Sequence, residues 1–593
     1  MNRIFNQNLS FFPLGQLCCI IFFIIILTII IKIENNEIVI QAANSTYASR
    51  ISISDFNSSN LPIIVINTGG QTIRDNYRIA ADMGIIYNGE GERNSLTDPF
   101  NDYKGKIRIE IRGSSSQMFP KKQYGFETQD SGGNNLNVSL LGMPDENDWI
   151  LYAPYSDKSL VRNVLIYKLA NDMGHYASKT KFCELVLNDD YRGIYVLMEK
   201  IKRDKNRVDI SKLNPDEIAG DDLTGGYILK IDKFAGESIG GWFSPFPPYL
   251  NAQQKIYYQY HYPKPDKIVP EQENYIQQFI YNFEYIMYTS EYADSISGYP
   301  QIIDINSFVD YFIMSEFSKN VDSYRLSAFM YKDKNSNNAK IVMGPVWDFN
   351  LAFGNADYYD GAKTEGWQLD YLTENVQFTR GDYFQVPFWW KRLIRDPNFL
   401  IKINLRWQDL RKQILDTDLY LNTIDSLTTY LDESQKRNFE RWPVLDNYVW
   451  PNAYIGHTYE NEITYLKQWI MDRLQWMDVN ISEYNSIDLA QESPTIPGEC
   501  FLNQNYPNPF NSLTVIRYGI SAPNQVILSI INILGQEIIT IVNEQQNAGY
   551  HQSFWDGKNS SGKPQTNGVY FCEIKVKSEK ETFYQIKKML LLK

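Results

Sequence analysis

GPVWDFNLAFGN, residues 344–355, is a mostly apolar stretch with one carboxylate, Asp348, near its middle. Together with the apolar residues before it, the stretch predicts a buried strand over 339–349 that ends in a glycine turn. Burying a carboxylate costs on the order of several kcal/mol unless a basic side chain, backbone amides or a cation compensates it. Asp348 is therefore interpreted either as a strand-end cap or as a ligand for a cation.

The residues upstream bear on this choice. FVDYFIMSEFSKNVDSYRLSAFMYKD, residues 308–333, predicts a helix, a polar turn over 319–324 and a strand. Asp322 lies in that turn, so one aspartate precedes the first strand of a predicted pair and Asp348 ends the second. Protein kinases use such a layout, in which one aspartate orients the hydroxyl nucleophile and the other holds magnesium. Asp322 taken alone also fits an Asx turn after Asn320.

A third stretch, RGSSSQMFPKKQY at 112–124, joins two alternating runs and predicts a hairpin over 104–130. A Ser/Gly-rich turn followed by lysines can bind phosphate through backbone amides and neutralise its charge. The pattern is neither a GK[ST] loop nor a GxGxxG turn. Lys121 and Lys122 fit a solvated strand edge equally well.

The composition bounds the class of protein. At 593 residues the chain is expected to form about three or four domains. Its net charge of −13 argues against a general nucleic-acid binder. Four histidines and five cysteines without a CxxC pair give no zinc pattern. A bridge between Cys500 and Cys572 is conceivable, whereas Cys183 is expected to be a small buried strand residue.

The start of the chain predicts export. The segment LCCIIFFIIILTIIIKI, residues 17–33, is almost uninterrupted apolar sequence, typical of a signal peptide or of an uncleaved membrane anchor. Residues 1–43 are therefore assigned to this segment and 44–58 to a linker. Any contact with a membrane is expected through this segment, if it is retained.

The remaining chain divides by its patterns. A β-rich part is expected to about residue 232, an insertion with long loops over 234–275, and a mainly helical part over 276–490. Helical spacing runs from Leu160 to Gly174, and two strands meet in a turn at Asp189–Asp190. After a linker at 491–500, short strands at regular spacing over 501–593 predict an all-β sandwich of immunoglobulin size. The expected fold class is α+β.

Six ordered motifs make residues 59–354 resemble the CotH family of spore-coat-type atypical protein kinases, and the helices to 490 are expected to complete the same domain. The motifs are IEIRGSSSQMFPKKQYGFET, NDWILYAPYSDKSLVRNVL, YRGIYVLMEKIKRD, GGYILKIDK, KNVDSYRLSAFMYKD and GPVWDFNLAFGN. The resemblance implies a bilobal kinase-like domain that binds ATP with Mg²⁺ or Mn²⁺ and phosphorylates Ser or Thr of proteins.

The resemblance also implies roles for individual residues. Asp322 would be the catalytic-loop aspartate and Asp348 the metal-binding one. Nucleotide contacts would come from Lys122, or Lys121 as second choice, from Arg112 with the turn Ser114, Ser115 and Ser116, and from Glu199 near the adenine. Arg162 could pair with a carboxylate of the site.

Two positions depart from the family pattern. Ser327 stands five residues after Asp322, where an asparagine is frequent, and Asn350 replaces the second acid of WDFD. Both are candidate metal ligands, and each contributes less than the usual group to a hard-cation site. The alternative is therefore a pseudokinase-like surface protein with weak transfer activity. Paired carboxylates in an aromatic-rich chain also occur in glycosidases, although no ordered motif supports that class.

The last domain has a resemblance of its own. NYPNPFNSLTVIRYGI, VILSIINILGQEI, the run from NAGYHQSFWDG to GVYFCEIKV, and the terminal KKMLLLK resemble the immunoglobulin-like sorting domains of type IX secretion, which are related to FlgD. This implies a Gram-negative-type bacterium, export to the extracellular space or the outer-membrane surface, and the type IX machinery as a partner. A secreted or surface protein would be the substrate.

Overall fold

The computed structural model describes residues 29–34, 37–42, 56–234, 240–375, 379, 381–482, 497, 499–505, 508–510, 514–577 and 582–592. Most of the expected export segment (1–43) and of the linkers at 44–58 and 491–500 lies outside these residues. Within the described part of the chain, no helix is both long and apolar enough to cross a membrane. The fold combines helices with several β-sheets, so the expected α+β class is confirmed.

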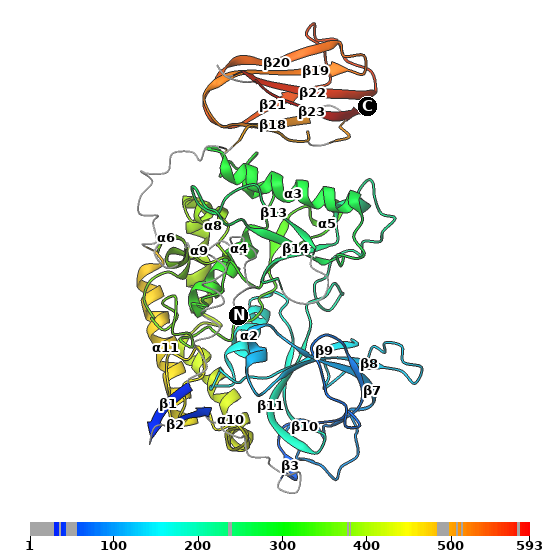
Figure 1. The fold of residues 1–593 in the computed structure, drawn as a ribbon. Coiled ribbons are helices and arrows are strands. Elements are labelled where there is room, and N and C mark those ends of the chain that lie inside the picture. The colour runs from blue at the N-terminus through cyan, green and yellow to red at the C-terminus, as the bar shows by residue number, and fades with distance from the viewer. Residues whose placement is uncertain are drawn as a thin grey trace, which may run out of the picture.

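The first part of the chain forms a closed barrel with the strand order β10–β11–β9–β8–β7–β5–β4 (Figure 1). Its hairpin β7–β8 pairs Ile111 with Tyr124, which confirms the predicted hairpin. Alternating apolar side chains of β7, such as Ile107 and Ile109, face the barrel core. The strands are β4 (Ile63–Asn67), β5 (Ile79–Ile86), β7 (Tyr103–Arg112), β8 (Gln123–Gln129), β9 (Asp148–Tyr152), β10 (Thr180–Leu187) and β11 (Asp190–Glu199).

Smaller elements precede and connect the barrel strands along the chain. The predicted helix between Leu160 and Gly174 is α2 (Arg162–Asp172), and β10 and β11 meet in a turn where Asn188 and Asp189 have positive φ. Cys183 is a buried residue of β10, as expected. The short pairs are β1 (Ile29–Glu34) with β2 (Glu37–Ala42), and β3 (Ser58–Ser59) with β6 (Asn94–Ser95).

A second sheet, in the order β13–β14–β12–β15–β16, lies between the barrel and the C-terminal strands (Figure 1). The range 234–275, interpreted from the sequence as an insertion, supplies β13 and β14 to this sheet. β14 pairs directly with β12, so this range is an integral part of the sheet. The strands are β12 (Tyr227–Ile231), β13 (Gly241–Phe243), β14 (Tyr257–Tyr262), β15 (Ala328–Lys332) and β16 (Ile341–Met343).

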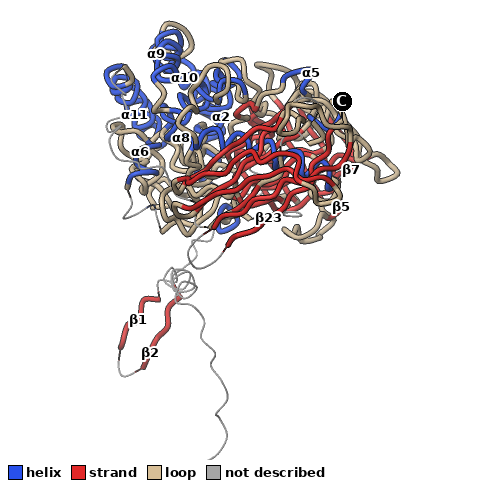
Figure 2. The backbone as a smooth tube through the Cα atoms, turned by 90° about the horizontal axis from the view of Figure 1, so that it is seen from above, coloured by secondary structure: helices blue, strands red, loops and turns tan. Residues whose placement is uncertain are grey.

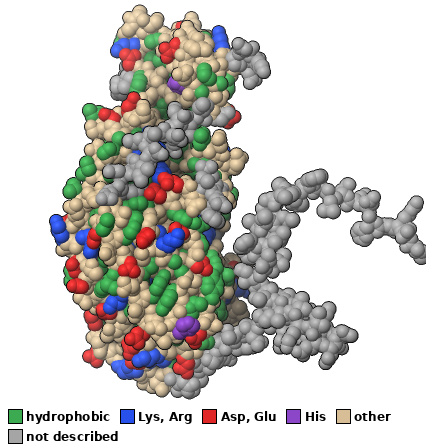
Figure 3. All heavy atoms as spheres, turned by 90° about the vertical axis from the view of Figure 1, so that its left-hand side faces the viewer, with side chains coloured by type: hydrophobic (Ala, Val, Ile, Leu, Met, Phe, Trp, Pro, Cys, Tyr) green, Lys and Arg blue, Asp and Glu red, His purple; other side chains and the backbone are tan. Residues whose placement is uncertain are grey.

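Helices form a layer at one side of the molecule, whereas the strands gather at the other (Figure 2). Asp304 caps α4 by accepting the backbone N–H of Ser307 at 2.9 Å, and the helix ends at Lys319 with a φ of 46°. The helices are α3 (Pro270–Tyr288), α4 (Ile305–Ser318), α5 (Asn335–Asn338), α6 (Gln368–Glu374), α8 (Trp389–Leu393), α9 (Pro397–Arg411), α10 (Thr417–Arg441) and α11 (Tyr459–Asn480). On the face shown in Figure 3, basic and acidic side chains are interspersed.

The C-terminal strands form two sheets, β17–β18–β21 and β20–β19–β22–β23, which share one hydrophobic core. We call this part, residues 499–592, the C-terminal module. Every strand expected from the sequence is present, and β17 and β20 are additional. Cys500 and Cys572 are both free thiols. The strands are β17 (Phe501–Leu502), β18 (Thr514–Ile520), β19 (Asn524–Asn532), β20 (Glu537–Gln546), β21 (Gly549–Trp555), β22 (Gly568–Lys577) and β23 (Thr582–Leu591).

The module contacts α3 through aromatic side chains. Tyr550 lies with its ring centroid 4.3 Å from that of Tyr288, and the guanidinium of Arg517 lies 4.6 Å from the ring centroid of Tyr285. Asn503 donates a hydrogen bond to the hydroxyl of Tyr281. The ring of Tyr550 also lies 5.5 Å from that of Phe246, a buried residue between β13 and β14. The module is thus attached to α3 and to the segment that packs beside it.

The same helix carries a buried acid that predicts a pH effect on stability. Glu284 accepts hydrogen bonds from the hydroxyls of Ser244 at 2.8 Å and Tyr258 at 2.9 Å. Burial raises its pKa to about 8, with these two bonds opposing the shift. In the unfolded chain the pKa would be near about 4.3, so between these values the folded state holds a proton that unfolding releases. This contribution to stability is present at low pH and is lost as the pH rises through 8.

Glu284→Gln is therefore expected to flatten the pH dependence of unfolding. Relative to wild type, the variant should gain on the order of a few kcal/mol between pH 5 and pH 8. Urea unfolding at both pH values measures this difference. Glu271→Gln, an exposed acid of the same helix, is the control and should follow wild type. Equal slopes in Glu284→Gln and wild type would contradict the prediction.

Candidate functional site

The candidate site lies where three strands of the second sheet begin or end; this end of the strands is called the sheet edge below. β12 and β15 are antiparallel with Ile231 opposite Ala328, so Asp232 leaves the sheet where Ser327 enters it. β16 also runs antiparallel to β15, and the backbone N–H of Gly344 bonds the carbonyl of Phe329 at 2.8 Å. The ends of β12 and β16 and the start of β15 therefore share this edge. The strand pairing therefore places Asp232, the Asp322 turn and the Asp348 segment at the same end of these strands.

The segment that contains Asp348 is not a strand, which corrects the prediction for 339–349. Only Ile341–Met343 join the sheet, because Pro345 has no N–H for a ladder. Asp348 itself has a φ of 62°, a left-handed conformation that aspartate tolerates better than most residues. Helix α2 holds the segment: the N–H of Asp348 bonds Tyr167 Oη at 3.2 Å, and that of Phe349 bonds Asn163 Oδ1 at 2.7 Å.

Asp348 is also more accessible than the sequence predicts. The residue is exposed at the surface. Desolvation of its carboxylate by the neighbouring protein atoms, followed by the negative charges of Asp322 and Asp232, raises its pKa to about 6, while Lys233 and Arg112 act in the opposite direction. Three aspartates are thus close enough to repel one another, and a bound cation would relieve this repulsion.

Asp322 is held in its turn by an arginine. Arg325 Nη2 lies 3.2 Å from Asp322 Oδ1, and Nη1 lies 2.6 Å from Asp382 Oδ2. The backbone N–H of Asp322 bonds the side-chain oxygen of Asn320 at 3.3 Å, which is the Asx-type contact considered above. The two interpretations of Asp322, as an Asx-turn residue and as a site residue, therefore do not exclude each other. The turn and Arg325 together fix the direction of its carboxylate.

Asp232 belongs to this cluster, although the family motifs give it no role. Its Oδ1 accepts the backbone N–H of Ser327 at 3.3 Å and the Ser327 hydroxyl at 3.4 Å. Its Oδ2 lies 3.1 Å from Lys230 Nζ. The signal was present in GGYILKIDK, where an acid follows an apolar strand directly, but its partner Ser327 is 95 residues away.

The serine-rich turn approaches the same edge from the barrel. Ser115 begins a short 3₁₀ helix, η1 (Ser115–Met118), and its hydroxyl lies 3.4 Å from Lys233 Nζ. Arg112 places its guanidinium 5.7 Å from the ring centroid of Trp347 and interacts with the charge of Asp348. The predicted phosphate turn, with exposed Ser114 and Ser115 and partly buried Ser116, is thus linked to the carboxylates through two basic residues.

The two candidate lysines have different environments. Lys121 is buried, with Nζ 2.7 Å from Asn438 Oδ1 and 5.2 Å from the ring centroid of Tyr195. Burial and the charge of Arg192 lower its pKa well below the ordinary value. Lys122 is only partly buried and donates to the carbonyl of Gln117 at 2.5 Å, at the end of the serine-rich turn. Of the pair, Lys122 lies beside the turn that was predicted to bind phosphate.

Glu199 and Arg162 have partners elsewhere. Glu199 is fully buried, and its Oε1 lies 3.0 Å from Arg207 Nη2. Arg162 Nη1 pairs with Asp157 at 2.7 Å rather than with Asp322 or Asp348, which corrects that expectation. Its Nε donates to the carbonyl of Phe353 at 3.3 Å, so Arg162 supports the Asp348 segment through the backbone.

Several residues around the site have left-handed backbone conformations, which cost on the order of 1–3 kcal/mol each outside glycine. These are Tyr324 (φ 70°), Ser327 (φ 48°), Asp348 (φ 62°) and Phe353 (φ 51°). Asn350 lies within the same segment and accepts a bond from Asn355 Nδ2 at its backbone carbonyl, 2.8 Å away. Clustered strain of this kind is typical of functional sites, where side chains must be aimed against backbone preference.

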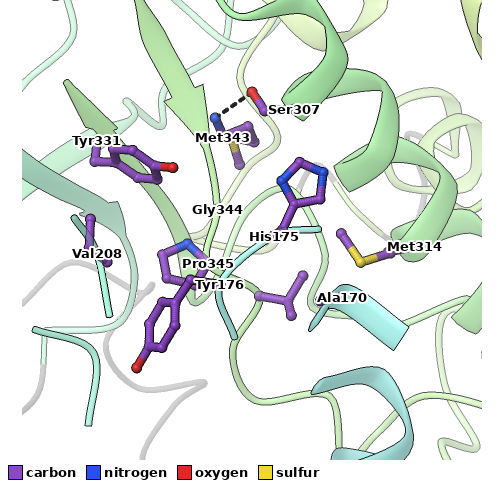
Figure 4. A pocket seen from close by; sticks show the side chains of 11 residues that line it. Ala170, His175, Tyr176, Val208, Ser307, Met314, Tyr331, Met343, Gly344 and Pro345 are labelled. Carbon is purple, nitrogen blue, oxygen red and sulfur yellow. Dashed lines mark hydrogen bonds between the residues drawn. The ribbon is translucent and has the colours of Figure 1, made fainter. Parts of the chain in front are cut away.

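Behind this segment lies a small cavity of about 20 Å³ (Figure 4). Its lining includes His175, Met314, Gly344 and Pro345, and the hydroxyl of Ser307 accepts the backbone N–H of Met343 at 2.9 Å. This volume suits about one water molecule. The cavity therefore belongs to the packing beneath the Asp348 segment and is too small for a nucleotide.

The donor set fits a nucleotide-bound magnesium ion rather than a protein-only cage. Magnesium is usually held by one or two carboxylates together with substrate phosphates. In the described part of the chain, no group of three or more His, Cys, Asp or Glu side chains is placed to hold a metal ion. Asp348 is accessible, with Asp232 and Asp322 nearby and basic residues facing them. This set could supply the one or two carboxylates that a nucleotide-bound magnesium ion needs from the protein.

Comparison with known proteins identifies the class. The family described as CotH kinase protein matches residues 109–477, which is more than half of the chain. The match spans Asp232, Asp322 and Asp348 as well as most of the barrel and the helices. The chain therefore belongs to the CotH kinase family. No curated protein matches it.

Matches to solved structures are short. Dimeric latent PorU from Porphyromonas gingivalis is 17% identical over 18% of this chain and 10% of its own, with a TM-score of 0.15. FlgD from P. aeruginosa is 23% identical over 16% of this chain and 62% of its own, with a TM-score of 0.11. PorZ, a surface component of the type IX secretion system of P. gingivalis, is 15% identical over 16% of this chain and 11% of its own, with a TM-score of 0.12. The chain thus spans less than two thirds of each structure, and such scores establish no shared fold.

Proposed function

We propose that the protein is an exported kinase that transfers the γ-phosphoryl group of ATP to Ser or Thr of secreted or surface proteins. The observation that carries the proposal is the meeting of Asp322 and Asp348 at one sheet edge, opposite the serine-rich turn and Arg112. Kinases use an aspartate that orients the hydroxyl, an aspartate that holds the metal, and a loop with a basic residue on the phosphates, and the residues at this site could supply these parts.

Each part of the site has a distinct task in this reaction. Asp322, fixed by Arg325, would accept the proton of the substrate hydroxyl. Asp348 would hold the metal, with Asn350 and Ser327 as candidate neutral ligands. Arg112, Lys122 and the turn at Ser114–Ser116 would bind and orient the phosphates. A bound Mg²⁺ or Mn²⁺ ion supplies neutralisation of the phosphate charge.

The proposal extends to location. The apolar segment at 17–33 supports export, and the motifs of the C-terminal module support recognition by type IX machinery, leaving the protein outside the cell or on the outer-membrane surface. The two sheets around one core are compatible with an immunoglobulin-like sorting domain. In this arrangement 59–490 is the kinase-like domain and 501–593 the sorting domain.

Asp348→Ala tests the reaction. The full chain incubated with γ-labelled ATP and Mg²⁺ or Mn²⁺ should label itself, and the variant should lose more than about 100-fold of this label because a metal ligand is missing. Asp357→Ala, which removes an exposed acid of the following loop, should keep the label.

The alternative predicts a different pattern. Neutral Asn350 and the engagement of Ser327 with Asp232 favour a pseudokinase-like surface protein, in which nucleotide binds without transfer. No label on the wild-type chain in either metal, together with a thermal shift that depends on Mg·ATP, would support this alternative and contradict the kinase.

A further inference from the structure

We propose that five aromatic side chains at the sheet edge bind a bulky apolar residue of the protein substrate, within about three positions of the hydroxyl that is phosphorylated. We call these side chains the aromatic platform: Phe234, Phe243, Tyr257, Tyr383 and Phe384. The inference rests on the proposed function and adds the class of substrate to it. The substrates are proteins whose acceptor Ser or Thr is close in sequence to an aromatic or branched aliphatic residue.

The five rings form one continuous surface. The ring centroid of Phe234 lies 5.0 Å from that of Tyr257 and 5.9 Å from that of Tyr383. It lies 6.3 Å from that of Phe384, and Phe243 lies 4.7 Å from Tyr257. The exposed fractions are 39% for Phe234, 48% for Phe243 and 52% for Tyr383. Exposed apolar side chains that lie together, in contrast to single ones, are typical of interaction sites.

The strand pairing places the first part of the platform beside the aspartates. β13 ends at Phe243, which is paired with Tyr257 at the start of β14. β14 runs antiparallel to β12 and begins where β12 ends. Gln259 of β14 donates its side-chain amide to the carbonyl of Asp232 at 2.6 Å, which fixes the segment that leads to Phe234. These three rings therefore lie at the sheet edge.

The second part of the platform is held by the arginine that also binds Asp322. Arg325 Nη1 donates to the carbonyl of Phe384 at 3.2 Å, whereas its Nη2 lies 3.2 Å from Asp322 Oδ1. One guanidinium thus connects the proposed catalytic carboxylate with the backbone of the platform. An extended peptide advances about 3.3 Å per residue. A substrate with its hydroxyl at Asp322 would therefore reach the platform with a side chain one to three positions away.

The angles between the rings favour a bulky side chain over the flat base of a nucleotide. The planes of the contacting rings are inclined to each other by 41° to 79°. A base stacks on a flat aromatic face, and none of these five ring pairs is parallel. Tilted rings can instead surround a side chain of irregular shape and remove it from water.

Short peptides with one serine in an alanine background test the inference. In each peptide, Phe or Lys occupies a single position up to about three residues from the serine. The full chain with Mg·ATP should phosphorylate the best Phe peptide with a kcat/KM about 10–100-fold above that of its Lys counterpart. Phe243→Ala/Tyr383→Ala should reduce this ratio to within about threefold and leave the KM for ATP unchanged.

Tyr584→Ala is the matched control. Tyr584 lies in β23 of the C-terminal module, and its exposed fraction of 52% equals that of Tyr383. This variant should keep the wild-type ratio between the Phe and Lys peptides. Should the double variant fold poorly by circular dichroism, Tyr383→Ala alone decides, because it truncates a single exposed side chain and should still lower the ratio.

Self-labelling with γ-labelled ATP separates the inference from the proposed function. If the wild type labels itself but prefers no Phe peptide, or if the double variant keeps the preference, only the inference fails. A raised KM for ATP with an unchanged preference would mean that the platform binds the nucleotide, and this also overturns the inference.

If the wild type labels neither itself nor any peptide, the proposed function fails. Binding of the same peptides, measured by fluorescence anisotropy, then decides on the platform. Tighter binding of the Phe peptide to the wild type, lost in the double variant, would support the platform as a peptide-binding surface. Equal affinity of the wild type for the Phe and Lys peptides would overturn it.

Discussion

Asp322→Asn is expected to lower the rate of phosphoryl transfer by about 10²–10⁴-fold while leaving the affinity for Mg·ATP within about twofold. The amide cannot accept a proton from the substrate hydroxyl, yet it has nearly the same shape and can still bond Arg325 through its oxygen. The loss should therefore appear in kcat rather than in KM for ATP. Single-turnover transfer to a model substrate and a separate nucleotide titration measure the two quantities.

Asp382→Asn provides the control for this experiment. Asp382 is the other carboxylate partner of Arg325, and it also accepts the hydroxyl of Tyr359 at 2.9 Å. If Asp322 acts in the chemistry, Asp382→Asn should cost less than about tenfold. Equal losses in the two variants would show that Asp322 serves to hold Arg325, and the assignment of a catalytic aspartate would be wrong.

Arg473→Met is expected to lower the free energy of unfolding by about 3–5 kcal/mol, the usual cost of breaking a buried ion pair from one side. Arg473 of α11 is completely buried and lies 3.4 Å from Glu316 Oε2 of α4. It also donates to the carbonyls of Glu316, Thr364 and Gly366 at 2.7–2.9 Å. The variant leaves these acceptors and a buried carboxylate without their cation.

Lys467→Met on the same helix is the matched control. Lys467 pairs with Asp425 at 2.8 Å in a more exposed position, where such pairs contribute about 0–1 kcal/mol. Urea unfolding of both variants gives the comparison. Arg473→Met as stable as Lys467→Met would mean that the buried pair contributes little, and Glu316→Gln combined with Arg473→Met should recover part of the loss.

The link between this pair and the site lies in α4. Glu316 also accepts the hydroxyl of Tyr324 at 2.8 Å and the backbone N–H groups of Gln368 and Leu369 at 2.7 and 2.9 Å. Tyr324 is two residues after Asp322, and its backbone is left-handed. Loss of Arg473 should therefore disturb the Asp322 turn before the whole domain unfolds.

Local patterns predicted much of the fold. Alternation in KIRIEIR identified β7, helical spacing located α2 and α4, and the turn between β10 and β11 was predicted at Asp189–Asp190, one residue after the observed pair with positive φ, Asn188 and Asp189. These features depend on residues close in sequence. The strand expected over 339–349 failed because apolar content says nothing about whether Pro345 can join a ladder or whether Asp348 needs a left-handed backbone.

The site was predictable only in part, for a related reason. Asp322, Asp348 and the serine-rich turn carry motifs that can be compared with a family. Asp232 and Lys233 become neighbours of these residues only through the pairing of β12 with β15. Lys121 and Lys122 are adjacent in sequence just before β8, but only the fold brings Asn438 of α10 to the buried Lys121 and leaves Lys122 beside Gln117.

The attachment of the C-terminal module to α3 bears on how a large substrate could approach. The hydrogen bonds and ring contacts described for the module reach Phe246, Tyr281, Tyr285 and Tyr288, and none described for it reaches the aspartates at the sheet edge. In the proposed location, the cell envelope would hold the protein through this module. A neighbouring protein could then bind at the aspartates while the module stays attached to the envelope.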